Sequence, residues 1–261
     1  MRDKARKIIT RKRVIVFFFM LSVIVLLVAV GLKKVKVNTW FAKEFSVKGV
    51  DVSHYQGDID WKVLEKQGIE FAFIKATEGS HFVDEKFKEN WDEATDTSLK
   101  IGAYHFFSFD SEGETQAENF IQTVGSLEGK LLPVIDVEYY GDKFKNPPEK
   151  TKVLVELKDM CNRLEQEYGV KPILYTTNVV YKRYLQGEFN FEEYPLWIRE
   201  VYLTPDITIQ DNWTFWQYSD SAVLDGYSGE EKYIDVNVCR GDEEALMTLM
   251  VDWKRKSDIG R

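Results

Sequence analysis

Histidine and cysteine are scarce in this sequence, which argues against zinc sites and disulfide frameworks. The 261 residues include three histidines and two cysteines, and none of them has a partner at the spacing of zinc ligands. We expect Cys161 and Cys239 to be buried free thiols. No metal and no cofactor is predicted, although a Ca²⁺ or Mg²⁺ site made only of carboxylates stays open at this level. The Gly-x-Ser-x-Gly motif of many serine hydrolases is also missing.

Basic residues are scarce beyond the amino-terminal segment. The formal net charge is −8, yet residues 1–36 hold ten Lys and Arg and one acidic residue. The remaining chain therefore has 25 basic and 42 acidic residues. Because nucleic-acid binding depends on neutralising phosphates with Lys and Arg, this composition argues against a nucleic-acid partner.

Charged residues are absent from residues 14–32. As a helix this segment would be about 28 Å long, close to the hydrocarbon thickness of a bilayer. Seven basic residues precede it and three follow it closely. This asymmetry predicts a cytoplasmic amino terminus and an extracellular carboxy-terminal domain.

The sequence therefore predicts a single-pass protein of the cell membrane. We assign residues 1–13 to a cytoplasmic basic segment, 14–32 to a transmembrane signal anchor, 33–45 to a stalk and 46–254 to the exported domain. The alternative is secretion after signal cleavage near Ala29-Val30-Gly31, a passable small-x-small site. No protein partner can be identified from the sequence.

Short apolar runs alternate with helical patterns in the exported part. The runs are mostly β-branched or aromatic, as in strands buried on both faces of a parallel sheet. They cover residues 49–53, 71–76, 101–107, 131–137, 172–176, 196–199, 214–218 and 234–238. Helices are expected near 60–66, 85–97, 112–124 and 148–168, with a last helix at 243–253. The alternation predicts an α/β fold, and eight strands suggest a barrel whose reactive groups lie at the carboxyl ends of the strands.

Two carboxylates end the fourth apolar run. Asp136 and Glu138 are two residues apart, so a strand would place them on one face, roughly 6.5 to 7 Å apart. Glycosidic bond cleavage needs an acid for the leaving oxygen and a second group that supports the positive centre. Acidic residues also end strands as solvated loop starts, so the pair alone is weak support for this chemistry.

Further polar and aromatic residues fall at the predicted strand ends. Aromatic rings cover the apolar faces of sugars, while carboxylates and amides bind their hydroxyl and acetamido groups. The candidates for substrate binding are Lys75, Tyr104, His105, Tyr175, Trp216 and Tyr218, and the further acids are Asp51 and Asp235. Any single aromatic among them is as readily explained by core packing. We expect the neighbouring negative charges to raise the pKa of Glu138 and keep it protonated, with Asp136 ionised.

Several motifs, in order along the chain, resemble glycoside hydrolase family 25, the Chalaropsis-type lysozymes or muramidases. They are GVDVSHYQG (49–57), FIKATEG (73–79), IGAYHFF (101–107), PVIDVE (133–138), LYT (174–176), LWI (196–198), FWQY (215–218) and IDVN (234–237). The resemblance implies a modified TIM-like barrel of five βα units followed by three strands. It departs at Arg199-Glu200-Val201-Tyr202, where a small residue and an aromatic are usual, so a sugar subsite is expected to differ there.

The resemblance also implies an activity and roles for the acids. The family cleaves the β-1,4 bond between N-acetylmuramic acid and N-acetylglucosamine in peptidoglycan. Glu138 matches its general acid and Asp136 the carboxylate that assists the substrate's acetamido group, while Asp51 and Asp235 match flanking acids. The alternatives are an N-acetylglucosaminidase or chitin-type hydrolase, and a catalytically silent glycan-binding domain. Peptidoglycan strands are the expected partner, with the membrane reached through the amino-terminal helix.

Overall fold

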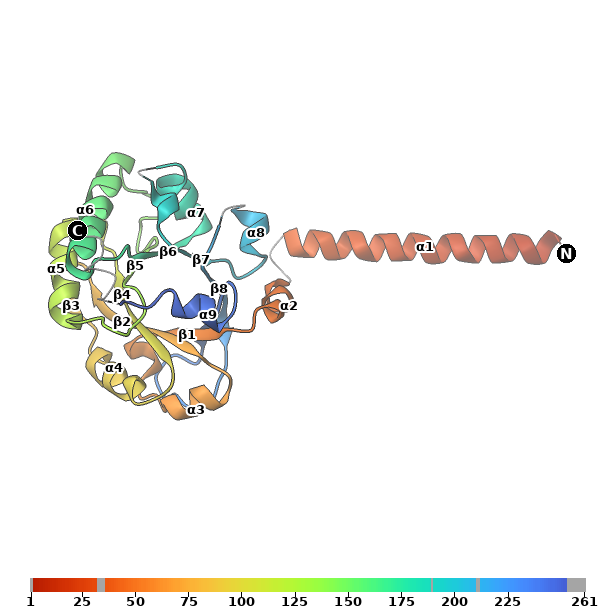
Figure 1. Cartoon of the computed structure of the whole chain (residues 1–261). Helices are drawn as coiled ribbons and strands as arrows, with labels where there is room; N and C mark the ends of the chain where they lie inside the picture. Colours follow the sequence, from red (N-terminus) through yellow and green to blue (C-terminus); the bar gives the residue numbers. More distant parts are fainter. Residues whose placement is uncertain (1, 32–35, 189, 210–211, 253–261) are drawn as a thin grey trace.

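The protein is built around a closed barrel of eight strands with a short ninth strand at its side (Figure 1). The computed structural model describes residues 2–31, 36–188, 190–209 and 212–252. The strands are β1 Lys48–Val52, β2 Phe71–Glu78, β3 Phe82–Val83, β4 Lys100–Phe106, β5 Val134–Val137, β6 Ile173–Thr177, β7 Leu196–Arg199, β8 Phe215–Ala222 and β9 Ile234–Cys239. Pairing of β1 with both β2 and β9 closes the barrel. The predicted eight-stranded α/β barrel is confirmed.

Seven barrel strands are parallel, and the eighth, β9, is antiparallel to both of its neighbours. Each of the first five barrel strands is followed by a helix before the next barrel strand. These helices are α3 Trp61–Lys66, α4 Phe87–Thr95, α5 Gly113–Val124, α6 Lys150–Tyr168 and α7 Asn178–Val180. In the described part of the connection between β7 and β8, the helix is the four-residue α8 Pro205–Thr208. Helices therefore thin out after the fifth strand, as the sequence predicts.

Local signals explain where the helices begin and end. The Asp60 carboxylate accepts a hydrogen bond from the Val63 amide at 3.1 Å and starts α3. Glu149 caps α6 in the same way, and Gly169 ends it in the left-handed conformation, with φ 70°. The last helix, α9 Glu243–Met247, is shorter than predicted, because the Val251 amide bonds the Lys130 carbonyl at 2.8 Å. This pairing requires extended backbone, and it buries Val251.

Aromatic rings fill the barrel interior beneath the carboxyl ends of the strands. The Phe73 ring lies 4.7 Å from Trp197 and 5.2 Å from Phe215, measured between centroids. Gly49 and Gly102 make room for these rings, since a Cβ on Gly102 would lie 2.7 Å from the Phe73 ring. The packed rings therefore fill the barrel interior below the carboxyl ends of the strands.

The amino-terminal helix α1 covers Arg2–Gly31, so it joins the basic segment and most of the uncharged run in one helix (Figure 1). Leu32 lies outside the described residues. Among the residues described, no helix is at once long and apolar enough to cross a membrane. The transmembrane helix predicted at 14–32 is therefore unsupported by the structure.

Residues 36–45, predicted as part of a stalk, lie against the barrel. They contain α2 Asn38–Phe41 and a 3₁₀ turn, Ala42–Glu44. The Val37 amide donates to the Tyr202 carbonyl at 3.1 Å, and the Asn38 side chain, which is fully buried, donates to the Tyr218 carbonyl. Residues 33–35 and the predicted domain end at 254 fall outside the described residues.

Close approach of α5 to α6 depends on Gly113. A Cβ at this position would lie 1.8 Å from the Glu156 carbonyl oxygen, a backbone atom that cannot move aside alone. We expect Gly113→Ala to lower the free energy of unfolding by about 1–3 kcal/mol, as overpacking does elsewhere. Urea unfolding measures it. The matched control is Gln122→Ala, at an exposed site of the same helix, and an equal loss in both variants would contradict this explanation.

Candidate active site

A cavity of about 380 Å³ opens at the carboxyl ends of the barrel strands. Its walls include seven of the ten residues that the sequence predicted for the site. They are Asp51, Lys75, Tyr104, Asp136, Glu138, Tyr175 and Asp235. The four predicted acids therefore share one pocket, although they come from β1, β9 and the end of β5.

Strand alternation and register bring these side chains together. In a closed barrel every second side chain points inward. Asp136 is paired with Tyr175 on the next strand, and Asp51 is paired with Asp235 across the closure of the barrel. Glu138, two residues after Asp136, lines the same cavity and is less buried. The i, i+2 argument made from the sequence is therefore confirmed.

Two amides hold the Asp51 carboxylate. The Gln217 amide nitrogen lies 3.1 and 3.2 Å from the two Asp51 oxygens and 2.9 Å from Asp235 Oδ2. Asn237 donates to Asp51 Oδ1 at 2.6 Å. Tyr175 donates to the Gln217 oxygen at 2.9 Å, and this bond fixes which end of the amide faces the acids.

The protons on this side of the pocket follow from these bonds. Burial raises the pKa of Asp51, while the hydrogen bonds from Asn237 and Gln217 oppose the rise. Burial, with the charge of Asp51, raises the pKa of Asp235 to about 9. At neutral pH, the ionised form is therefore more favourable for Asp51 than for Asp235, and Asp235 is the one that keeps its proton.

Asp136 and Glu138 differ in burial. Asp136 is 7% exposed, and its Oδ1 has no hydrogen-bond partner among the described residues. Burial raises its pKa well above the ordinary value, and the Glu138 charge adds to the rise. Burial also raises the pKa of Glu138, but Arg199 and Lys75 oppose this. The predicted rise in the pKa of Glu138 is confirmed, although burial is a larger cause than the like charge of Asp51. The expectation that Asp136 stays ionised is corrected, because burial and the Glu138 charge raise its pKa as well.

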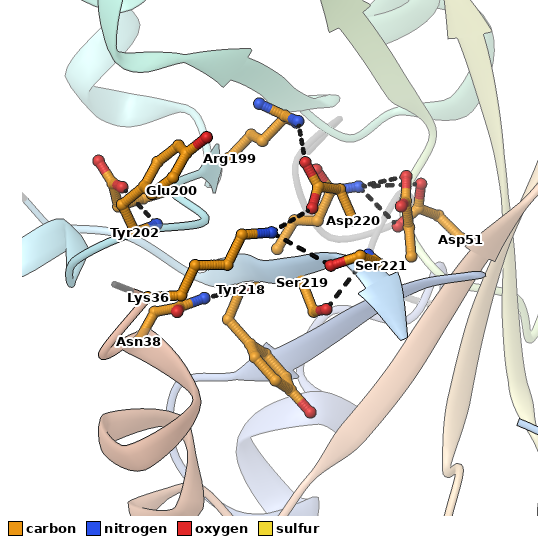
Figure 2. A network of polar contacts seen from close by, with 12 residues as sticks. Lys36, Asn38, Asp51, Arg199, Glu200, Tyr202, Tyr218, Ser219, Asp220 and Ser221 are labelled. Carbon is orange, nitrogen blue, oxygen red and sulfur yellow. Dashed lines mark hydrogen bonds and ion pairs between the residues drawn. The ribbon is translucent and has the colours of Figure 1, made fainter. Parts of the chain in front are cut away.

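Two cations lie among these acids. Lys75 Nζ is 2.7 Å from Glu78 Oε2 and lies over the Phe106 ring. Arg199 Nη2 is 2.7 Å from Asp220 Oδ2 (Figure 2). The Arg199 charge lowers the pKa of both Glu138 and Asp235. As for a resident metal, no three His, Cys, Asp or Glu side chains within the described part of the chain are arranged to hold one.

Comparison with known proteins decides the family. The model of the glycosyl hydrolases family 25 matches residues 50–227. The chain belongs to this family.

Relatives and solved structures agree with the assignment. Lysozyme M1 of Streptomyces globisporus is 31% identical over 78% of this chain and 71% of its own. The N,O-diacetylmuramidase of Chalaropsis sp is 29% identical over 74% of this chain and 96% of its own. The structure of a family 25 glycosyl hydrolase from Bacillus anthracis superposes with a TM-score of 0.74 and 51% identity, covering 79% of this chain and 94% of that one. The protein is thus a glycosidase of family 25.

Three residues predicted to bind substrate lie elsewhere in this family 25 barrel. Trp216 is 0% exposed and donates to the Glu200 carbonyl at 2.7 Å, and Tyr218 packs edge-on against it. His105 is fully buried between Thr77 Oγ1 and Gln116, and burial lowers its pKa to about 4. The predicted sugar contacts of these three are therefore corrected.

The reason for these misplacements is the phase of the strand alternation. On β8, Phe215 packs with the aromatic rings inside the barrel, and Gln217 donates to Asp235 in the pocket. Because side chains alternate along a strand, Trp216 and Tyr218 face outward. Starting from a core-facing Phe215, a period of two selects Gln217 as the site residue. The two amides are functional candidates that the sequence argument did not select, and Arg199 entered it as a departure at a sugar subsite. Tyr55 and Tyr233, 58% and 40% exposed at the pocket rim, were also missed, since loops carry no such periodicity.

Ionisation of Asp235 gives the stability of the protein a pH dependence with a defined sign. The folded state keeps this proton up to about pH 9, whereas the unfolded chain releases it near the ordinary value of 3.8. The folded state binds more protons between these values, so the free energy of unfolding falls as pH rises through the window. We expect Asp235→Asn to flatten this fall. Urea unfolding at about pH 5 and about pH 9 checks it, and an unchanged slope in the variant would contradict it.

Proposed function

We propose that the protein is a muramidase that hydrolyses the β-1,4 bond between N-acetylmuramic acid and N-acetylglucosamine in peptidoglycan. The observation that carries this proposal is the pocket of four carboxylates at the strand ends of a family 25 barrel. The names of its relatives, a lysozyme and an N,O-diacetylmuramidase, support the choice of substrate.

Glu138 is the proposed general acid. It is the less buried member of the Asp136 and Glu138 pair, so a glycosidic oxygen entering the pocket can reach it. Its raised pKa favours the protonated form that donates to the leaving oxygen.

Asp136 is proposed to orient the acetamido group of the substrate. Its Oδ1 accepts no bond from the described residues, so an acetamido N–H supplies the donor that a buried carboxylate needs. This bond stabilises the Asp136 carboxylate and leaves the proton of the pair on Glu138. The acetamido oxygen then bonds to the anomeric carbon as the leaving oxygen departs with the Glu138 proton. Water attacks that carbon next, breaks the bond to the acetamido oxygen and gives a proton back to Glu138.

Asp51 and Asp235 are assigned to charge stabilisation. Asp51, held by two amides, places a fixed negative charge near the anomeric centre as that centre becomes positive. Asp235, with its raised pKa, keeps a proton and so spares the pocket a further charge. A catalytically silent glycan-binding domain would not need all four acids in one pocket.

Product analysis tests this activity. The full-length protein is incubated with purified peptidoglycan, and the products are reduced with borohydride and hydrolysed. We expect muramitol, and we expect Glu138→Gln to lose activity by about 10²–10⁴-fold because the proton donor is removed. The matched control is Glu244→Gln, an exposed acid of α9. Glucosaminitol would instead indicate an N-acetylglucosaminidase, and no product from the wild type would favour a glycan-binding domain.

We further propose that the barrel acts outside the cell and is tethered by residues 14–32. Support comes from the uncharged sequence of this segment and from its large apolar side chains, which are exposed along α1 from Val14 to Leu26. The basic residues before it favour a cytoplasmic amino terminus. Tethering would raise the effective concentration of the barrel at the wall.

Cell fractionation tests the tether. We expect the full-length protein in carbonate-washed membranes and a variant lacking residues 14–31 in the soluble fraction, because the apolar segment is removed. Protease added to intact protoplasts should digest the barrel. Recovery of a soluble protein whose mass corresponds to a start near Leu32 would contradict the tether and indicate secretion.

A further inference from the structure

The segment that follows α1 is bound to the barrel through several kinds of contact. We call residues 36–45 the strap. Its buried Asn38 donates to the Tyr218 carbonyl, and Ala42 is also buried. At its end, the Phe45 ring lies 5.1 Å from Trp213 and 6.3 Å from Trp216. The strap is therefore packed onto the outer face of β8, the face opposite to the pocket side chains.

Lys36, the first residue of the strap, contacts a residue of the pocket wall. Its Nζ lies 2.8 Å from Asp220 Oδ1 and 3.1 Å from Ser221 Oγ, and it lies over the Tyr202 ring (Figure 2). Asp220 itself lines the cavity. Burial raises the pKa of Asp220, but the hydrogen bond from Lys36 and the charge of Arg199 outweigh it, so the net pKa is lowered.

Asp220 is shared between two cations. Its Oδ1 takes Lys36 and its Oδ2 takes Arg199, as the dashed lines in Figure 2 show. A guanidinium normally uses both oxygens of a carboxylate when both are available. Lys36 contacts one of these oxygens, and within the described part of the chain Arg199 contacts the carboxylate through one nitrogen, Nη2. The Arg199 charge also acts on Glu138 and Asp235, where it opposes the rise in the pKa of each carboxyl group.

We propose that Lys36 is a positioning residue, which through Asp220 holds Arg199, the register partner of Gln217, beside the pocket acids and so couples docking of the strap to Glu138. The inference depends on the proposed muramidase function only in its predicted effect on kcat/KM for peptidoglycan.

Loss of Lys36 changes the competition for Asp220. Arg199 can then take both carboxylate oxygens and turn away from Glu138. The attraction that lowers the pKa of Glu138 weakens, so this pKa rises. The ionisable groups that bear on Glu138 from the surrounding strands are Asp51, Lys75, Tyr104, Asp136, Tyr175, Arg199 and Asp235. Only Arg199 among them contacts the partner of the strap.

The experiment is a double-mutant cycle on the full-length protein in detergent. The pKa of the Glu138 carboxyl is measured by ¹³C NMR on glutamate-labelled protein, and Glu138→Gln assigns the signal. The second quantity is the apparent pKa of the alkaline limb of kcat/KM on peptidoglycan. We expect Arg199→Gln to move both to higher pH by about one unit, and Lys36→Met to move both in the same direction by less. Lys36→Arg keeps the charge and should restore the wild-type values. Lys43→Met, at an exposed site of the strap, is the control without effect.

The double variant decides the matter. If Lys36 acts through Arg199, Lys36→Met adds nothing to the shift of Arg199→Gln. Additive shifts, or an unmoved Glu138 titration in Lys36→Met, would overturn the inference. A lower melting temperature without a Glu138 shift would overturn it too, since it assigns Lys36 a merely structural role. The NMR titration does not need turnover, so an inactive wild type would count against the muramidase function and leave this inference decided on its own.

Discussion

Closure of the barrel by an antiparallel strand is the constraint on which the pocket depends. Because β9 runs against both neighbours, it places Asp235 opposite Asp51 and Asn237 opposite Gln217. Those register pairs create the bonds that hold the Asp51 carboxylate. A parallel closing strand would present a different end of β9 to the pocket, and Asp51 would lose its amide donor from Asn237. The antiparallel direction is thus a requirement of the chemistry as well as of the topology.

Gathering four carboxylates in one cavity is costly, since burial disfavours each charge and each neighbour repels the next. Three features of the site reduce this cost. Amides stabilise Asp51 as an anion, raised pKa values let Asp136 and Asp235 hold protons before substrate binds, and Arg199 and Lys75 oppose the rise in the pKa of Glu138. The four acids therefore do not all share one protonation state at a given pH. A glycosidase needs this inequality, because it uses one carboxyl group as an acid and another as an anion.

The sequence predicts the barrel and the acids well, because both follow from short-range rules. Apolar runs of strand length mark the eight barrel strands, and the two-residue spacing of Asp136 and Glu138 puts both in the pocket. The aromatic contacts fail where the phase of alternation was not used, as at Trp216. Arg199 and the strap fall outside such rules. Their roles depend on Lys36 meeting Asp220, 184 residues later in the chain, and no local pattern encodes that contact.

In the inference drawn above, a residue of the strap, outside the barrel, affects the charges in the pocket. A surface ion pair alone contributes little, as the two charges remain solvated. Lys36, Asp220 and Arg199 differ from such a pair, because Asp220 lines the cavity and Arg199 interacts with its acids. Moving Lys36 would then redistribute charge at the pocket rather than remove a contact at the surface.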